Sequence, residues 1–532
     1  MKNNFEKIEE ASNRKFEFIK NPFLILAIIG IVGLFLRIIY FPHNVPLSLD
    51  GIDYFVYATA IVHQGQFPDG ILPTNNGWPT FLSALFYFFH STNMLDLMNL
   101  QRYAAIIISV LTIIPVYFLC RKFAGKYSAL VGAALFCFEP RIIQNSLLGL
   151  TEPLYIFLGA FAFVLFLGNK IKMIYISSIV IALLSLVRYE GLLLFIPLSI
   201  MFFIRFRNND RFILKYFVVV GIFILVMLPM AMIRIEHTGQ DGLISHLFSG
   251  PKFVSKIVIS GEPDLNDPMI GEDGKNKLGY FMTTSLINLV KYLGWVTIPL
   301  FVCFLPFGIL KILKTKERKT IIFLCVVGII MLIPAMYAYG RNIQETRYLY
   351  IIFPLLCIIS GYSTIFLEKI PRKNTVFALI LVGIIFASIG FLEYKKTDYK
   401  DEEERYVITM QVINIAKGVN DYQGNKYVKV ATIEKNWPSL PELDNRNRTT
   451  YELKKIPSGD FNTLEKYIKS SKDLGLTHLV IESKNKLTFL DDVFYNDSKY
   501  TYLIKQYDSD DQGFKTQIRI YKINYDYFES LK

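Results

Sequence analysis

Residues 22–41 read PFLILAIIGIVGLFLRIIYF, an almost unbroken apolar run. Crossing the hydrocarbon core of a bilayer takes a helix of about 20 apolar residues, which is the length of this run. The run is too long for the hydrophobic part of a signal peptide, and no small-residue cleavage site follows it. We therefore interpret it as a retained first membrane span.

The same apolar pattern recurs along most of the chain. Of the 532 residues, 52% are apolar and only 19% are charged, and the mean hydropathy is +0.36. This profile is typical of a protein with a lipid-facing surface. It predicts a polytopic α-helical membrane protein with about eleven transmembrane helices, at approximately 22–41, 103–120, 128–146, 152–168, 172–187, 189–204, 213–233, 286–310, 320–338, 348–367 and 374–392.

The basic residues predict the orientation of these spans. The chain has 57 Lys and Arg against 45 Asp and Glu, a balance that would suggest a nucleic-acid partner in a soluble protein. Here they lie mostly in the tail 1–21 and in short loops between apolar runs, whereas residues 38–101 contain no Lys or Arg. By the positive-inside rule, we expect a multi-pass protein of the cell membrane with a cytoplasmic N-terminus and no nucleic-acid partner.

Two long loops and the C-terminal part have a different composition. The loop 42–101 is predicted to be external and to hold two short helices lying along the interface, near 53–63 and 78–90. The loop 234–285 is rich in Gly, Asp and Pro and is interpreted as an external lid. After the transmembrane domain 22–392, strand-like runs alternate with a helical pattern, which predicts a soluble α/β domain at 393–532. An odd number of spans places it outside the cell.

Charged residues stand at the ends of several predicted spans. Insertion of a charge at a helix centre costs roughly 2.5 to 3.5 kcal/mol, so charges near a membrane are paired, snorkelled or used. The predicted topology places all of them at the external interface, which indicates a common cavity there. They are Asp50, Asp53, Arg102, Glu139, Arg141, Glu152, Arg188, Glu190, Arg341, Glu345 and Arg347.

Each of these residues also has a purely structural interpretation. Asp50 and Asp53 could cap a helix or lie in a solvated loop, and Glu152 could cap the fourth span. Arg188 and Arg347 could be snorkelling side chains, and Arg141 could pair only with Glu139. The histidines show no ligand spacing with a neighbouring acid, and the five cysteines show no paired spacing, so we predict neither a metal site nor a disulfide framework.

The first external loop resembles a known family. The residues SLDGIDYFVYA at 48–58, with GQFP at 65–68 and GWP at 77–79, are similar to the first loop of the polyprenyl-phosphate-sugar glycosyltransferases of the GT-C fold. Dolichyl-phosphate-mannose protein mannosyltransferases and lipid A aminoarabinose transferases are the members it resembles most. In that family an Asp opens the loop helix, with a Tyr four residues on, as Asp50 and Tyr54 do here. Many members have Glu directly after the Asp, whereas this chain has Gly51.

Three further segments resemble the same family. The residues TEPLY at 151–155 are similar to the polar start of its fourth span, and VRYEG at 187–191 to its Arg-x-Glu-Gly turn. The residues ETRYL at 345–349 resemble its Arg-Tyr-Leu segment before a proline-containing span. The Trp-Trp-Asp motif of the oligosaccharyltransferase branch is absent from the C-terminal part.

The resemblance implies a membrane glycosyltransferase. It would move a sugar from a polyprenyl (dolichyl) phosphate to a protein, glycan or lipid acceptor at the outer face, with inversion. The resemblance names no cofactor and leaves open whether a divalent cation assists. In the site it implies, Asp50 is the general base with Asp53 as helper or substitute, and the substrate is bound by Tyr54, Arg141, Glu152, Arg188, Arg341, Glu345 and Arg347.

A transporter or flippase of a lipid-linked or polar substrate is the alternative function. Such a protein would be expected to carry ionisable residues near the middle of its spans and to have symmetric halves with interrupted helices. The charges of this chain cluster instead at one predicted face, and no halved pattern is visible. We therefore favour the enzyme.

Overall fold

The fold is described from a computed structural model of the chain. It describes residues 21–48, 50–67, 75–89, 91, 94–168, 170–242, 245, 277–315, 318–370, 373–417, 428–432, 442–444, 449–451, 453–454, 461–483 and 488–531. The predicted tail, except Asn21, and most of the predicted lid loop therefore lie outside the described residues. The chain forms two compact units: the larger comprises residues 1–41, 48–85 and 100–396, and the smaller comprises 42–47, 86–99 and 397–532.

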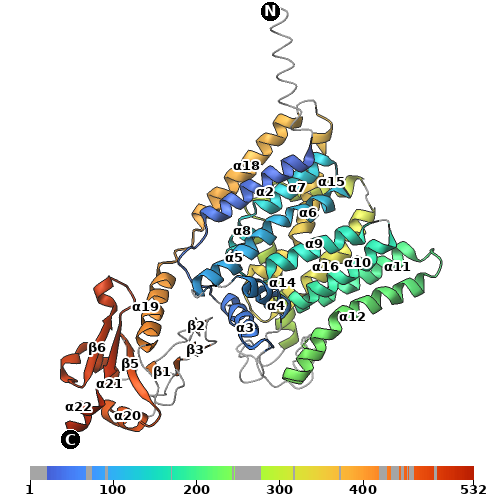
Figure 1. Ribbon diagram of the computed structural model, residues 1–532. Helices are drawn as coiled ribbons and strands as arrows, with labels where there is room; N and C mark the ends of the chain where they lie inside the picture. Colours follow the sequence, from blue (N-terminus) through green and yellow to red (C-terminus); the bar gives the residue numbers. More distant parts are fainter. Residues whose placement is uncertain are drawn as a thin grey trace, which may run out of the picture. The chain divides into compact units, whose positions relative to one another are not determined.

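The larger unit is built of α-helices joined by short connections (Figure 1). Short 3-10 helices stand at four of these connections: η2 (Tyr189–Leu194), η3 (Phe301–Cys303), η4 (Thr346–Ile352) and η5 (Ile365–Glu368). The α-helices are α2 (Pro22–Ile39), α3 (Asp50–Gln64), α4 (Gly77–Phe88), α5 (Met94–Leu111), α6 (Ile113–Arg121), α7 (Lys126–Cys137), α8 (Pro140–Ser146), α9 (Glu152–Phe166), α10 (Ile171–Val187), α11 (Phe195–Phe206), α12 (Phe212–Thr238), α14 (Lys277–Thr297), α15 (Leu305–Thr315), α16 (Arg318–Gly340), α17 (Phe353–Ser363) and α18 (Lys373–Tyr394).

The helices confirm a multi-pass membrane protein. Among the described residues, seven helical segments are long and apolar enough to cross a bilayer, and α14 with α15 would make an eighth as a bent pair. Three shorter apolar helices, α7, α9 and α10, fall on the predicted third, fourth and fifth spans. The predicted third span, 128–146, is broken after Cys137. Pro140 lacks the N–H that a continuing helix needs, and it opens α8 instead.

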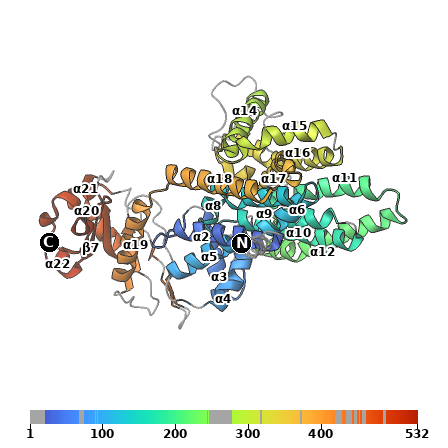
Figure 2. The same cartoon turned by 90° about the horizontal axis from the view of Figure 1, so that it is seen from above.

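The predicted eighth span, 286–310, is not one straight helix. Its two halves are bent by 93° at the break between α14 and α15. The Ser285 hydroxyl donates to the Met336 carbonyl, and the Asn288 amide donates to the Tyr339 carbonyl. Since both contacts reach the end of α16, α14 lies across that end instead of running along α16, and Figure 2 shows the two helices at an angle.

The loop 42–101 does contain two helices, α3 and α4, close to where they were predicted. Hydrogen bonds tie their starts to the turn between α8 and α9. The indole N–H of buried Trp78 donates to the Gly149 carbonyl at 3.0 Å, and the Gln101 amide donates to the carbonyls of Gly149 (2.8 Å) and Gly51 (3.0 Å). Gly149 has a φ of +70°, which a residue without a side chain adopts most easily. These bonds fix the position of Asp50.

The smaller unit contains a mixed sheet, as predicted for the C-terminal part. The strands β1 (Val428–Thr432), β4 (Leu453–Lys454), β5 (Leu476–Glu482), β6 (Leu503–Asp508) and β7 (Ile518–Ile523) form a sheet in the order β4-β1-β5-β7-β6, in which β1 is parallel to β4 and β5. A separate pair joins β2 (Glu442–Asp444) and β3 (Thr449–Tyr451). The helices of this unit are α19 (Lys400–Lys417), α20 (Leu464–Ser471), α21 (Thr488–Tyr495) and α22 (Tyr525–Ser530), with η6 (Asp497–Lys499) and η7 (Ser509–Gln512).

Candidate functional site

Arg347 connects two carboxylates from distant parts of the chain. It lies in the first turn of η4, just after Glu345, and Asp50 opens α3. Its Nη1 donates to Asp50 Oδ2 at 2.5 Å, and its Nε forms an ion pair with Glu345. The side chains of Asp50 and Glu345 are 43% and 45% exposed, so this cluster opens to solvent. The carboxylate of Asp50 is therefore used for a tertiary ion pair.

Arg188 forms a second, buried cluster. It lies between α10 and η2, and its guanidinium bonds Glu152 Oε1 at 2.5 Å and Glu190 Oε1 at 2.7 Å. The rings of Tyr155 and Tyr348 lie 5.7 and 5.9 Å from the guanidinium carbon. Although burial opposes the charge, the carboxylates of Glu190 and Glu152 keep the pKa of Arg188 well above its usual value.

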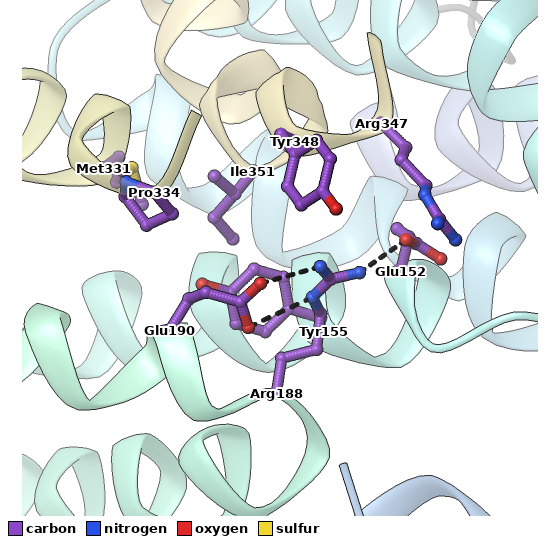
Figure 3. A pocket seen from close by; sticks show the side chains of 9 residues that line it. All are labelled: Glu152, Tyr155, Arg188, Glu190, Met331, Pro334, Arg347, Tyr348 and Ile351. Atoms are coloured by element: carbon purple, nitrogen blue, oxygen red, sulfur yellow. Dashed lines mark hydrogen bonds and ion pairs between the residues drawn. The ribbon is translucent and has the colours of Figure 1, made fainter. Parts of the chain in front are cut away.

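The two clusters meet in one pocket (Figure 3). The guanidinium of Arg347 lies beside the Glu152 carboxylate, and the two groups interact electrostatically. Glu152 is buried, and its second carboxylate oxygen, Oε2, has no hydrogen-bond partner among the described residues. The free interior of the pocket is about 10 Å³, enough for roughly one water molecule. The lining residues are Glu152, Tyr155, Arg188, Glu190, Met331, Pro334, Arg347, Tyr348 and Ile351.

All of these charged groups lie at one end of the helical bundle. Asp50 follows α2, Glu152 opens α9, Arg188 follows α10 and Arg347 precedes α17. Since successive membrane helices alternate in direction, these positions share one side. Figure 1 shows α3 near the end of α12 and away from the turn that joins α11 to α12. That this side faces outward stays a prediction from the charge of the loops.

Tyr54 is the other candidate close to this pocket. Its ring is buried one turn after Asp50, and its hydroxyl accepts a hydrogen bond from the Asn75 amide at 3.4 Å. Burial raises the pKa of Tyr54, and the charges of Arg188, Glu152 and Asp50 act on it as well. It is therefore close enough to contact a molecule bound beside Asp50.

Three predicted site residues line this pocket: Glu152, Arg188 and Arg347. Asp50 and Glu345 adjoin it through their ion pairs with Arg347, and Tyr54 lies near it. The other three predicted residues are Asp53, Arg141 and Arg341. Asp53 is exposed on α3 and makes no ion pair within the described part of the chain. Arg141 pairs with Glu139 at 3.1 Å, bonds the Ile298 carbonyl and lies against aromatic rings. Arg341 lies over the ring of Tyr337. None of the three lines the pocket, so their proposed roles have no geometric support here.

Some lining residues were not predicted. Tyr155 and Tyr348 stand next to Glu152 and Arg347 in the motifs already quoted, so their proximity was a usable signal. Glu190 was recognised as an interfacial charge but was given no role in the site. Met331 and Pro334 come from α16, whose uniformly apolar sequence gave no indication that one side faces a polar pocket.

The described residues contain no group of three or more His, Cys, Asp or Glu that could hold a metal ion. Beside the pocket, the carboxylates of Asp50 and Glu345 share the guanidinium of Arg347. A positive charge is thus already present where a cation would have to bind these two groups.

Comparison with known proteins identifies the fold. No protein-family model and no curated protein sequence matches this chain. The solved structure of ArnT from Cupriavidus metallidurans bound to undecaprenyl phosphate is similar, with a TM-score of 0.53, 9% identity and coverage of 94% of this chain and 97% of that chain. The Archaeoglobus fulgidus oligosaccharyltransferase in complex with Zn and sulfate has a TM-score of 0.52 and 17% identity, and covers 86% of this chain and 68% of that chain. This chain therefore has the GT-C fold, as its sequence predicted.

Proposed function

We propose that this protein is a glycosyltransferase that moves a sugar from a polyprenyl phosphate, such as dolichyl phosphate, to an acceptor at the outer face of the membrane. The observation that carries this proposal is the convergence of Asp50, Glu152, Arg188 and Arg347 at one end of a membrane bundle. Two structures that share the fold, named above, are an oligosaccharyltransferase and a protein that binds undecaprenyl phosphate. The shared fold supports the proposal that this site carries out the same class of reaction.

Asp50 is the group best suited to act as general base. Its half-exposed carboxylate can be reached by an acceptor hydroxyl or amine, whereas the carboxylates of Glu152 and Glu190 are buried. In the proposed step, the acceptor atom attacks the anomeric carbon and its proton passes to Asp50. The bond between that carbon and the phosphate oxygen breaks, and its electron pair leaves with the phosphate. One such displacement inverts the anomeric centre.

The guanidinium groups are suited to the leaving group. The lipid phosphate gains one negative charge as the bond breaks, and guanidinium N–H groups can bind phosphate oxygens in pairs while staying charged. Arg347 is the more accessible of the two, and Arg188 is held in place by Glu152 and Glu190. Oε2 of Glu152, which has no hydrogen-bond partner among the described residues, can accept a hydrogen bond from a sugar hydroxyl. Both aromatic rings beside Arg188 limit how far it can move.

The experiment that tests this proposal is a transfer assay on purified protein in nanodiscs. A panel of polyprenyl-phosphate sugars, including mannosyl and aminoarabinosyl donors, is incubated with peptide, glycan and lipid acceptors. Asp50→Asn should lower the transfer rate by roughly 10² to 10⁴-fold, the usual contribution of a general base. Glu236→Gln removes an exposed acidic side chain near the end of α12 and serves as the charge control. Transfer that survives in Asp50→Asn contradicts the assignment.

The same preparation tests the transporter alternative. Reconstituted vesicles with donor in one leaflet are followed for donor that appears in the other leaflet. If the protein is a glycosyltransferase, glycosylated product should form and the donor should not move between leaflets in a protein-dependent way. Protein-dependent movement without product would support a flippase and refute the proposed transfer.

A further inference from the structure

The proposed base is already occupied in this structure. Oδ2 of Asp50 accepts a hydrogen bond from Arg347 at 2.5 Å. Protonation of Asp50 would remove the negative charge that pairs with the guanidinium, so the ion pair opposes the uptake of an acceptor's proton. Asp50 is therefore a better proton acceptor once Arg347 has been drawn away from it.

The charge of the pocket shows what a phosphate meets when it arrives. Both guanidinium groups of the two clusters are engaged by carboxylates, which outnumber them two to one. A phosphate that approaches either guanidinium therefore competes with the carboxylates already paired with it. The groups are Arg188 and Arg347 with Asp50, Glu152, Glu190 and Glu345.

Burial decides which guanidinium the phosphate takes. The carboxylates on Arg188 have side chains only 2% and 8% exposed, so losing their partner would leave buried charges unpaired. The carboxylates on Arg347 are nearly half exposed, so water can solvate them once they are released. Arg347 is thus the guanidinium that is released at the lower free-energy cost.

We infer that the donor phosphate displaces Asp50 from Arg347, so that the base becomes free only in the donor complex. This inference rests on the proposed function. After transfer, Asp50 carries the acceptor's proton and is neutral, so it no longer competes with the product phosphate. Loss of that proton to water restores the negative charge of Asp50. The Arg347–Asp50 pair then re-forms and helps expel the lipid phosphate.

The test measures the affinity of farnesyl phosphate, a short polyprenyl monophosphate, for the full-length protein by calorimetry. Asp50→Asn removes the competitor for Arg347 and should bind farnesyl phosphate about tenfold more tightly than wild type, although it is inactive in transfer. Glu345→Gln removes the second competitor and should also tighten binding. Equal or weaker binding by both variants overturns the inference. Thermal melting of each variant checks that it is folded.

A second background separates displacement from simple repulsion between Asp50 and the phosphate. In Arg347→Gln, the guanidinium for which Asp50 competes is absent. In this background, Asp50→Asn should raise the affinity for farnesyl phosphate no more than Glu236→Gln, which removes an exposed charge, raises it in the wild-type protein. A tenfold gain in both backgrounds would mean repulsion alone and would overturn the inference, while leaving the proposed function intact. If wild type does not bind farnesyl phosphate at all, both the proposed function and the inference fail.

Discussion

Replacing Arg188 by Met tests whether the buried cluster is an ion-pair network. The substitution keeps most of the side-chain volume but leaves the carboxylates of Glu152 and Glu190, which are 2% and 8% exposed, without their cation. Breaking a buried pair by removing one partner costs about 3 to 5 kcal/mol. We expect Arg188→Met to lower the free energy of unfolding by about that amount and to abolish transfer.

The matched control is the triple variant Arg188→Met, Glu152→Gln, Glu190→Gln. It removes the stranded charges together with the guanidinium, so it should recover most of the lost stability while remaining inactive. Stability is measured by thermal melting and denaturant titration in the same detergent. A melting temperature of Arg188→Met equal to that of wild type, or a triple variant less stable than the single one, would refute the network.

Three further predictions concern other parts of the chain. Burial lowers the pKa of His478 to about 4, against about 6.5 in an unfolded chain, so the free energy of unfolding of the smaller unit should fall by up to roughly 3 kcal/mol between pH 6.5 and pH 4 and should not change above pH 6.5. Hydrogen exchange in β5 measures this loss, and His478→Gln should make the stability less dependent on pH. A Cβ on Gly33 would lie 2.2 Å from the Cys137 sulfur, so Gly33→Ala should destabilise by about 1 to 3 kcal/mol and Cys137→Ala should restore the loss in a melting assay. In intact cells, an impermeant maleimide should label Tyr495→Cys but not Asn209→Cys, and the reverse pattern would invert the predicted topology.

The sequence could predict the spans and the end of the bundle at which the site lies, for a physical reason. Long apolar runs have few alternatives to a membrane helix, and charges near a membrane are paired, snorkelled or used. Arg188 and Glu190 are near neighbours in one turn, so their pairing follows from local sequence. The fourth-span Glu152 was placed on the same side by counting helices.

What the sequence could not predict depends on tertiary contacts. Asp50 and Arg347 are separated by 297 positions, and nothing in either motif says that they pair directly. The sequence of α14 is apolar enough to resemble a span, but contacts with the end of α16 place it across that helix. By contrast, the pairing of Arg141 with Glu139, two residues before it, was one of the interpretations that the sequence itself offered.

A structure of the protein with undecaprenyl phosphate in a nanodisc tests the central claim most directly. The account predicts the phosphate within hydrogen-bond distance of Arg347, beside Arg188 and Glu152, with the Asp50 carboxylate detached from the guanidinium. A phosphate bound elsewhere on the bundle, or one bound here while Asp50 and Arg347 remain paired, would contradict it.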